Sequence, residues 1–262
     1  MISATATLLT SAPAAQADTQ YGGTGLYKGT RPANPSISLL HRDDGRIAGR
    51  VVVGARCRGY ANYSLVVRIS GRTADGVNFN ANGRTRLGRG YVRVTLTGTL
   101  AADAATGTAR VRTTGCRTYR NPFTLRTPSA PAGAAAVPAP GTLMFGTTSQ
   151  AVGAMALPVT IRVARNGRVA MSSQTLVQCS RIRLPVLDFT PTRAVRPDGT
   201  FGGTQRYTIR YKDLRESYSV TVRGQFLADG ATGTINVTLR QRDSKGRYPL
   251  CRSGQQTWAA RG

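Results

Sequence analysis

Alternation of apolar and polar residues with a period of two is the clearest pattern in this chain. In Val92–Leu100 the apolar residues and Gly98 fall on one face, and Arg93 and three threonines fall on the other. Tyr218–Phe226 repeats this pattern. One apolar and one polar face is typical of an antiparallel sheet with one side in water. Further strands are predicted at Ile47–Val53, Tyr63–Ile69, Ala109–Thr113, Val159–Ala164, Thr175–Cys179, Gln205–Tyr211 and Thr234–Arg240.

Asp-Gly and Asn-Gly pairs punctuate these segments and predict hairpin turns, because both residue types tolerate positive φ. The pairs are Asp44-Gly45, Asp75-Gly76, Asn82-Gly83, Asn166-Gly167 and Asp198-Gly199. The short runs Leu100–Ala105 and Phe226–Ala231 are predicted to connect strands and to include a helical turn.

The chain repeats itself at a shift that begins at 126 residues. Tyr91–Thr108 closely resembles Tyr218–Thr234, and Tyr21-Gly22 aligns with Phe145-Gly146. Several short strands with regular turns in each copy predict an all-β protein of two tandem antiparallel β-sandwich domains, of jelly-roll or immunoglobulin-like type. The predicted organisation is a signal peptide at 1–17, a first repeat at 18–127, an Ala/Pro linker at 128–141 and a second repeat at 142–262.

The order of these motifs resembles a repeat of exported actinobacterial proteins, most of them uncharacterised. The repeat runs from an aromatic-Gly pair through a Cys and Asp-Gly-x-Phe to Ala-Asp-x-Ala-Thr-Gly-Thr and a final Cys-x-Ser-Gly-x3-Trp. The second copy carries the closing motif as Cys251–Ala259, whereas the first departs from it with Phe123 in place of Trp. The resemblance covers nearly the whole mature chain and implies export and a β-sandwich, but no activity.

Positive charge is spread over both copies. The net charge is +25, from 36 basic and 11 acidic residues, and only three of the basic residues are lysines. Residues 18–127 contribute +13 and residues 141–262 contribute +12. A GC-rich genome would explain the arginine surplus, and an anionic partner would give it a function; either way such a field attracts polyanions.

The N-terminus predicts export. Residues 1–17 end in Ala15-Gln16-Ala17, which fits a signal-peptidase site, although no basic residue precedes the short apolar stretch. A small-residue tail is the alternative. No stretch approaches 18 consecutive apolar residues, so no membrane span is expected. We therefore expect a secreted or cell-envelope protein.

Four cysteines allow three disulfide pairings. One pair in each copy favours Cys57–Cys116 and Cys179–Cys251, in the oxidising space that an exported chain enters. A zinc site is the competing interpretation, but it requires close pairs such as C-x2-C, which this chain lacks.

Catalytic chemistry has few residues to use. His41 is the only histidine, and Glu216, the only glutamate, is predicted to be a surface charge in a strand connection. The aspartates present in both copies are Asp75/Asp198 and Asp103/Asp229, which are predicted to build turns. We expect no catalytic residue, no cofactor and no metal. A polysaccharide-acting enzyme that uses these aspartates stays open as an alternative.

Anion binding is the favoured function, because arginine offers a planar fork for carboxylate or phosphate groups. The candidate residues are Arg117, Arg126, Arg252, Arg261 and Trp258. Trp258 is better explained as a core residue, since its counterpart is Phe123. No nucleic-acid motif is found, so no specific nucleic-acid partner is expected. The sequence predicts a non-enzymatic module that binds anionic cell-wall polymers or polysaccharides, with a spacer that has no ligand as a third possibility.

Overall fold

The protein is built from β-strands. The computed structural model describes residues 18–27, 31–55, 63–88, 90–115, 118–180, 182–210, 214–243, 246 and 250–262, and it contains no helix in these ranges. The first eight strands are β1 (Thr19–Tyr27), β2 (Arg31–His41), β3 (Arg46–Ala55), β4 (Tyr63–Thr73), β5 (Asn78–Leu87), β6 (Gly90–Leu100), β7 (Ala104–Thr113) and β8 (Tyr119–Arg126). The next eight are β9 (Leu143–Val152), β10 (Met155–Val163), β11 (Arg168–Cys179), β12 (Ile182–Ala194), β13 (Thr200–Arg210), β14 (Leu214–Leu227), β15 (Gly230–Asp243) and β16 (Leu250–Arg261).

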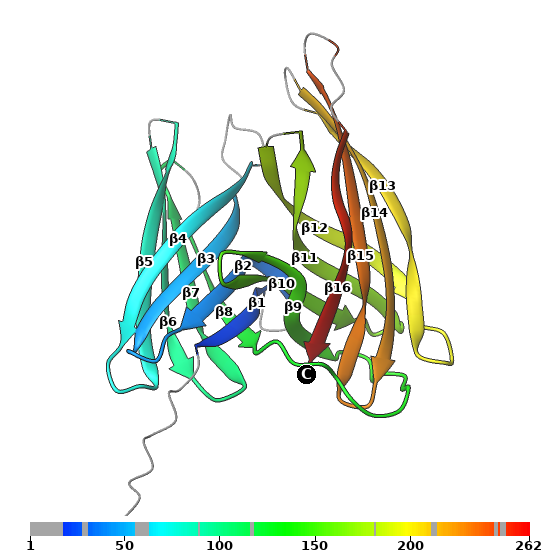
Figure 1. The fold of residues 1–262 in the computed structure, drawn as a ribbon, viewed down its shortest axis with the longest axis horizontal. Helices are drawn as coiled ribbons and strands as arrows, with labels where there is room; N and C mark the ends of the chain where they lie inside the picture. Colours follow the sequence, from blue (N-terminus) through cyan, green and yellow to red (C-terminus); the bar gives the residue numbers. More distant parts are fainter. Residues whose placement is uncertain are drawn as a thin grey trace, which may run out of the picture.

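Strands β1–β8 form a closed barrel in which each strand pairs with the next (Figure 1). The barrel closes through β1 and β8, which pair from Gly22 opposite Arg126 to Gly25 opposite Phe123. Alternate residues point inward, and the buried apolar side chains make one core. Inward positions of β6 are filled by Val92, Val94 and Leu96, all fully buried.

Strands β9–β16 repeat this cyclic order and curl around a second core. Here β9 pairs with β16, as β1 pairs with β8, but no ladder joins β12 to β13 in the described residues. The equivalent ladder of the first barrel, between β4 and β5, is short and spans only Ser70–Thr73 on β4. The second barrel is therefore interrupted at the place where the first has few pairs. We call this interruption the seam.

The predicted β-sandwich is wrong, because both units curl into barrels. Alternation reports that a strand has a dry face and a wet face, and a sandwich and a barrel satisfy this requirement equally. What separates them is the pairing of β1 with β8 across about a hundred residues of chain. Local patterns carry no information on such a distant pair.

Three of the predicted local features also differ from the structure. Asn82-Gly83 lies inside β5 and makes no turn; a Cβ on Gly83 would lie 1.9 Å from the carbonyl oxygen of Arg68. The runs at Leu100–Ala105 and Phe226–Ala231 contain tight turns and no helical turn. The other four Asp-Gly and Asn-Gly pairs lie in turns, with positive φ at each glycine.

The two barrels pack through equivalent strands, with β1 and β2 against β9 and β10. The Ser38 hydroxyl donates to the carbonyl oxygen of Ala156 at 2.8 Å. A Cβ on Gly22 would lie 2.6 Å from the Thr147 side chain, so glycine permits this close approach. Strands in this interface are dry on both faces, which is why β9–β11 contain long buried runs instead of alternation.

The strand register also shifts the predicted alignment of Tyr21-Gly22 with Phe145-Gly146 by one residue. Gly22 lies opposite Arg126 in the first barrel, and Phe145 lies opposite the equivalent Arg261 in the second. Phe145 therefore corresponds to Gly22, not to Tyr21. Tyr21 belongs to the first core, whereas Phe145 lies beside Thr160 on the side of β9 that faces the first barrel.

The segment at 128–141 packs against the end of the second barrel. The backbone N–H of Ala132 donates to Asp229 at 2.6 Å, and the N–H of Ala136 donates to the carbonyl of Phe226 at 3.1 Å. Cys179 and Cys251 form a disulfide that joins β11 to β16. Cys57 and Cys116 lie outside the described residues, so their pairing stays a prediction.

A pair of facing glycines makes room for one large aromatic ring in each barrel. Gly98 lies opposite Gly107 near Phe123, and Gly224 lies opposite Gly233 near Trp258. Trp258 is only 2% exposed and also contacts Phe201, with ring centroids 6.0 Å apart. The repeated glycines in the sequence therefore reflect core packing.

We predict that Gly224→Ala destabilises the protein by about 1–3 kcal/mol, because the core there has no space for a methyl group. The added Cβ would lie 2.4 Å from Phe201 and 2.7 Å from Trp258. Urea unfolding monitored by Trp fluorescence measures the change, with Ser219→Ala on the outer face of the same strand as the control. Equal unfolding midpoints for the two variants would contradict this packing.

Candidate functional site

Aspartates gather at one end of each barrel because antiparallel neighbours turn at alternate ends. The turns between β2 and β3, β4 and β5, β6 and β7, β12 and β13, and β14 and β15 share this position. They hold Asp44, Asp75, Asp103, Asp198 and Asp229. Figure 1 shows these ends of the two barrels on the same side of the molecule. We call this side the aspartate end and the opposite side the arginine end.

Asp75 and Asp198 hold their own turns. Asp75 Oδ1 accepts hydrogen bonds from the backbone N–H groups of Val77 at 3.0 Å and Asn78 at 2.6 Å. Asp198 Oδ1 accepts from the hydroxyl and the N–H of Thr200 at 2.7 and 2.9 Å. Bonds from Asn78 lower the pKa of Asp75, and bonds from Thr200 lower the pKa of Asp198.

Asp103 and Asp229 pair with the arginines that recur with them. Arg126 Nη1 lies 2.6 Å from Asp103, and Arg261 Nη2 lies 3.1 Å from Asp229. Arg261 also donates to the carbonyl of Ala130 at 2.6 Å. Two of the predicted anion-binding arginines are thus already engaged by carboxylates. All four repeated aspartates hold turns or form ion pairs with arginine.

A row of three arginines crosses the outer face of the first barrel. Arg84 on β5 lies directly opposite Arg93 on β6, which lies opposite Arg112 on β7. All three are exposed, and none forms an ion pair with a carboxylate of the described residues. The exposed ring of Tyr91 lies beside them, with its centroid 5.3 Å from the Arg84 guanidinium carbon. Like charges directly opposite one another destabilise a sheet.

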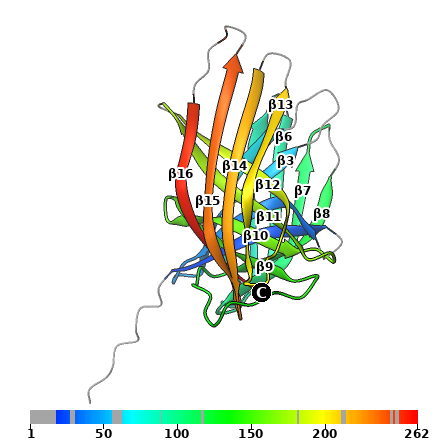
Figure 2. The same ribbon diagram turned by 90° about the vertical axis from the view of Figure 1, so that its right-hand side faces the viewer.

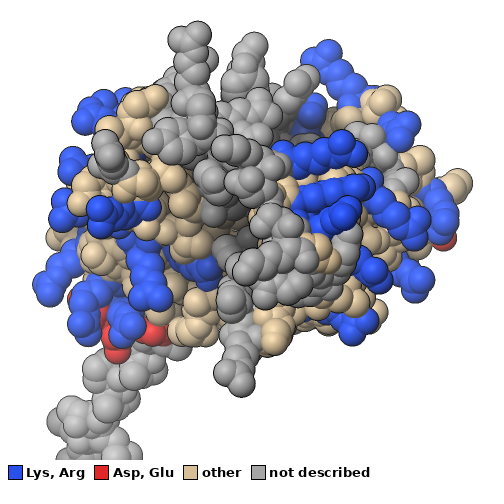
Figure 3. All heavy atoms as spheres, turned by 90° about the horizontal axis from the view of Figure 1, so that it is seen from above, with Lys and Arg blue, Asp and Glu red and all other residues tan. Residues whose placement is uncertain are grey.

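A second row crosses the outer face of the second barrel. Arg210 on β13 lies opposite Arg215 on β14, which lies opposite Arg242 on β15. Strands β13–β16 run side by side on this face (Figure 2). Arg84 corresponds by register to Arg206, so the two rows occupy different rungs of the same outer face. Viewed onto the arginine end, Lys and Arg side chains lie on both halves of the molecule (Figure 3).

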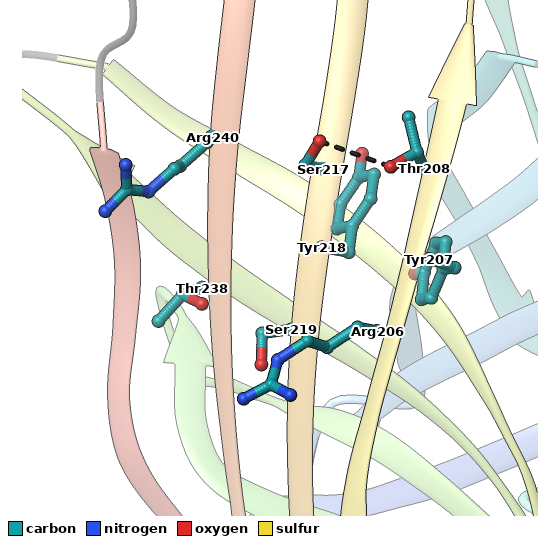
Figure 4. Close-up of a pocket in the computed structure, with 8 residues that line it drawn as sticks. All are labelled: Arg206, Tyr207, Thr208, Ser217, Tyr218, Ser219, Thr238 and Arg240. Carbon is teal, nitrogen blue, oxygen red and sulfur yellow. Dashed lines mark hydrogen bonds between the residues drawn. The ribbon is translucent and has the colours of Figure 1, made fainter.

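A groove of about 340 Å³ lies next to the second row. Figure 4 shows Arg206 extending from β13 across β14 towards Ser219 and Thr238, with Arg240 on β15. The groove is lined by Arg206, Tyr207, Thr208, Ser217, Tyr218, Ser219, Thr238 and Arg240. The Thr208 and Ser217 hydroxyls lie 3.3 Å apart. The lining residues carry two guanidinium groups, six hydroxyls from serine, threonine and tyrosine, and no carboxylate, which suits an anionic or hydroxylated ligand.

Of the predicted site residues that the structure describes, only Arg252 lies beside this groove, and it does not line it. Arg252 is exposed on β16 directly opposite Thr238, which lines the groove. Trp258 is buried in the core and presents no ring to a sugar or base. Arg117 lies outside the described residues.

Sequence reasoning missed two features. Tyr91 and Arg93 are two residues apart on one strand, and this spacing could have shown that an aromatic ring and arginines share a face. Glu216 was predicted at the surface of a connection, but it lies within β14 and is 9% exposed. The alternation of β14 places Glu216 inside the barrel. The sequence signal for this position is that the period of two continues before Tyr218, through Glu216.

The described residues contain no group of three or more His, Cys, Asp or Glu side chains that would hold a metal ion. Within the same residues, no helix has the length and apolarity needed to cross a membrane.

Comparisons with known proteins identify no family. No family model and no curated protein matches this chain. Among solved structures, it is similar to a protein of unknown function from the DUF3598 family of Nostoc punctiforme, with a TM-score of 0.17 and 6% identity. That alignment covers 93% of this chain and 94% of the other. A TM-score this low supports no conclusion about fold or function, and the resemblance to actinobacterial proteins stays a prediction.

We predict that Asp75→Ala lowers stability at neutral pH and that the difference from the wild type shrinks below about pH 4. The pKa of Asp75 is lower in the folded state, so its contribution is present above the unfolded pKa and is lost as pH falls through the folded value. Urea midpoints measured across pH test this expectation. The exposed Asp43→Ala serves as the control, and a pH-independent difference for Asp75→Ala would contradict it.

Proposed function

We propose that this protein is an exported, non-enzymatic module that binds anionic polymers through the outer faces of β5–β8 and β13–β16. The ligand class is a cell-wall polymer or polysaccharide that carries phosphate, sulfate or carboxylate groups. Guanidinium groups in a row match the repeated charges of such a chain.

The observation that carries the proposal is the pair of cross-strand arginine rows. Arg84, Arg93 and Arg112 repel one another, as do Arg210, Arg215 and Arg242, and this repulsion costs the folded state stability. Meanwhile the three ion pairs formed by Asp44, Asp103 and Asp229 lie at the other end. A polyanion that lies along the rows would relieve the repulsion.

Two faces on one molecule favour a long ligand. The rows belong to two barrels that are packed together, so a polymer that reaches both would gain from a second, intramolecular contact. The groove beside Arg206 and Arg240 adds a place for one charged group of the chain. The disulfide between Cys179 and Cys251 is consistent with function in an oxidising compartment.

We predict that binding to long-chain polyphosphate weakens steeply as salt rises, because each bound arginine releases counterions from the polymer. Replacing Arg84, Arg93 and Arg112 together by Gln is expected to reduce the slope of log K against log salt by up to about three. Fluorescence anisotropy of labelled polyphosphate measures this slope, and neutral dextran tests for binding without charge.

The matched control replaces Arg72, Arg165 and Arg196, three exposed arginines towards the aspartate end, and it makes the same change in net charge. We expect this control to keep the wild-type slope within experimental error. Equal losses in both triple variants would show that overall charge acts without a defined face. Salt-resistant binding to dextran would overturn the proposal in favour of neutral-sugar recognition.

A further inference from the structure

A carboxylate lies inside the second barrel near its arginine end. Glu216 points into the barrel, where the Tyr218 hydroxyl donates to Oε2 at 2.6 Å and Gln241 Nε2 donates to Oε1 at 2.9 Å. Both donors are neutral, and no cationic side chain of the described residues pairs with this carboxylate. A buried carboxylate is costly unless a positive charge compensates it.

Two aromatic rings and a second acceptor lie beside Glu216. Tyr207 is directly opposite Tyr218, and their rings stack with centroids 4.8 Å apart. Figure 4 shows the two rings on neighbouring strands, β13 and β14. One rung further into the barrel, Gln205 lies on the same inward face, and its buried Oε1 accepts no hydrogen bond. The inward face thus presents oxygen acceptors on either side of a tyrosine pair.

The first barrel shows that the fold does not require this cluster. Tyr207 opposite Tyr218 corresponds by register to Thr85 opposite Val92, since Phe201 opposite Gly224 corresponds to Phe79 opposite Gly98. The same correspondence gives the counterparts of the remaining members. Gln205, Glu216 and Gln241 correspond to Gly83, Gly90 and Gly115. A barrel with small or apolar residues at all five positions closes fully, so the cluster is particular to the second barrel.

We propose that this cluster is a binding site for a small organic cation, an alkylammonium or guanidinium group. Glu216 and Gln205 supply acceptors for N–H donors, and the tyrosine rings attract a cation through their π-faces. The cluster lies beside the seam, because β13 carries no ladder to β12 in the described part of the chain. None of the six arginines of the outward rows takes part in this site, although Tyr207 and Tyr218 also line the groove beside Arg206 and Arg240. The site does not depend on the polymer-binding proposal.

The two sites should respond to salt in opposite ways. The net charge of +25 repels a cationic ligand at long range, and salt screens this repulsion more than it screens a buried contact. We therefore expect cation binding to hold or strengthen as salt rises, whereas polymer binding weakens.

The test is an NMR titration of the full protein with n-butylammonium, followed through the side-chain resonances of Tyr207, Tyr218 and Gln205. The neutral isostere n-butanol should give no saturable shift. Glu216→Gln keeps the shape of the side chain but removes its charge, and it should weaken n-butylammonium binding by about tenfold or more. Asp43→Asn removes one exposed negative charge elsewhere and should leave the affinity unchanged.

Three results would overturn the site: no saturable shift with n-butylammonium, equal affinity in Glu216→Gln, or equal binding of n-butanol. If Glu216→Gln fails to fold, Gln205→Leu decides the matter, because no hydrogen bond to the Gln205 carbonyl oxygen is lost. A folded Gln205→Leu protein with wild-type affinity for n-butylammonium would contradict the proposal, and weaker binding would support it. Retained polyphosphate binding shows that the variants keep the outer faces.

Discussion

Antiparallel pairing between consecutive strands is the interaction on which the rest of this structure depends. It sends alternate turns to opposite ends of each barrel, so the Asp-Gly turns collect at one end. The same pairing sets strand residues opposite one another in fixed rungs, and two rungs on the outer faces each hold three adjacent arginines. The separation of charge along the barrels therefore follows from the topology, because aspartates build the turns at one end and arginines occupy outward strand positions towards the other.

The two barrels share a plan but differ in ways that suggest divided roles. Both keep a facing glycine pair beneath one aromatic ring. Both also keep an Asp–Arg ion pair at equivalent turns, between β6 and β7 in the first barrel and between β14 and β15 in the second. These features stabilise the fold. In contrast, the arginine rows stand on different rungs, and the inward cluster around Glu216 occurs in the second barrel alone. The features that differ are those on which the two binding proposals rest.

Local sequence patterns were enough to predict the strands, most turns and the role of the repeated aspartates, because each of these depends on a few neighbouring residues. The strands at Val92–Leu100 and Tyr218–Phe226, for example, follow from alternation alone. Barrel closure could not be predicted, since the pairing of Gly22 with Arg126 joins distant segments. The arginine rows were hidden for the same reason: Arg84 and Arg112 meet Arg93 only through register. Glu216 was misplaced because neighbouring charged residues resembled a connection, although the period of two continues through it.

The most direct test of the account is to map where a polyanion contacts the protein. Amide resonances of the protein would be followed by NMR as long-chain polyphosphate is added at low salt. The account predicts the largest shifts on the outward residues of β5–β8 and β13–β16 at the arginine end, including Arg93 and Arg215, with little change in the aspartate turns. Largest shifts at the aspartate end, or equal shifts over the whole surface, would contradict it.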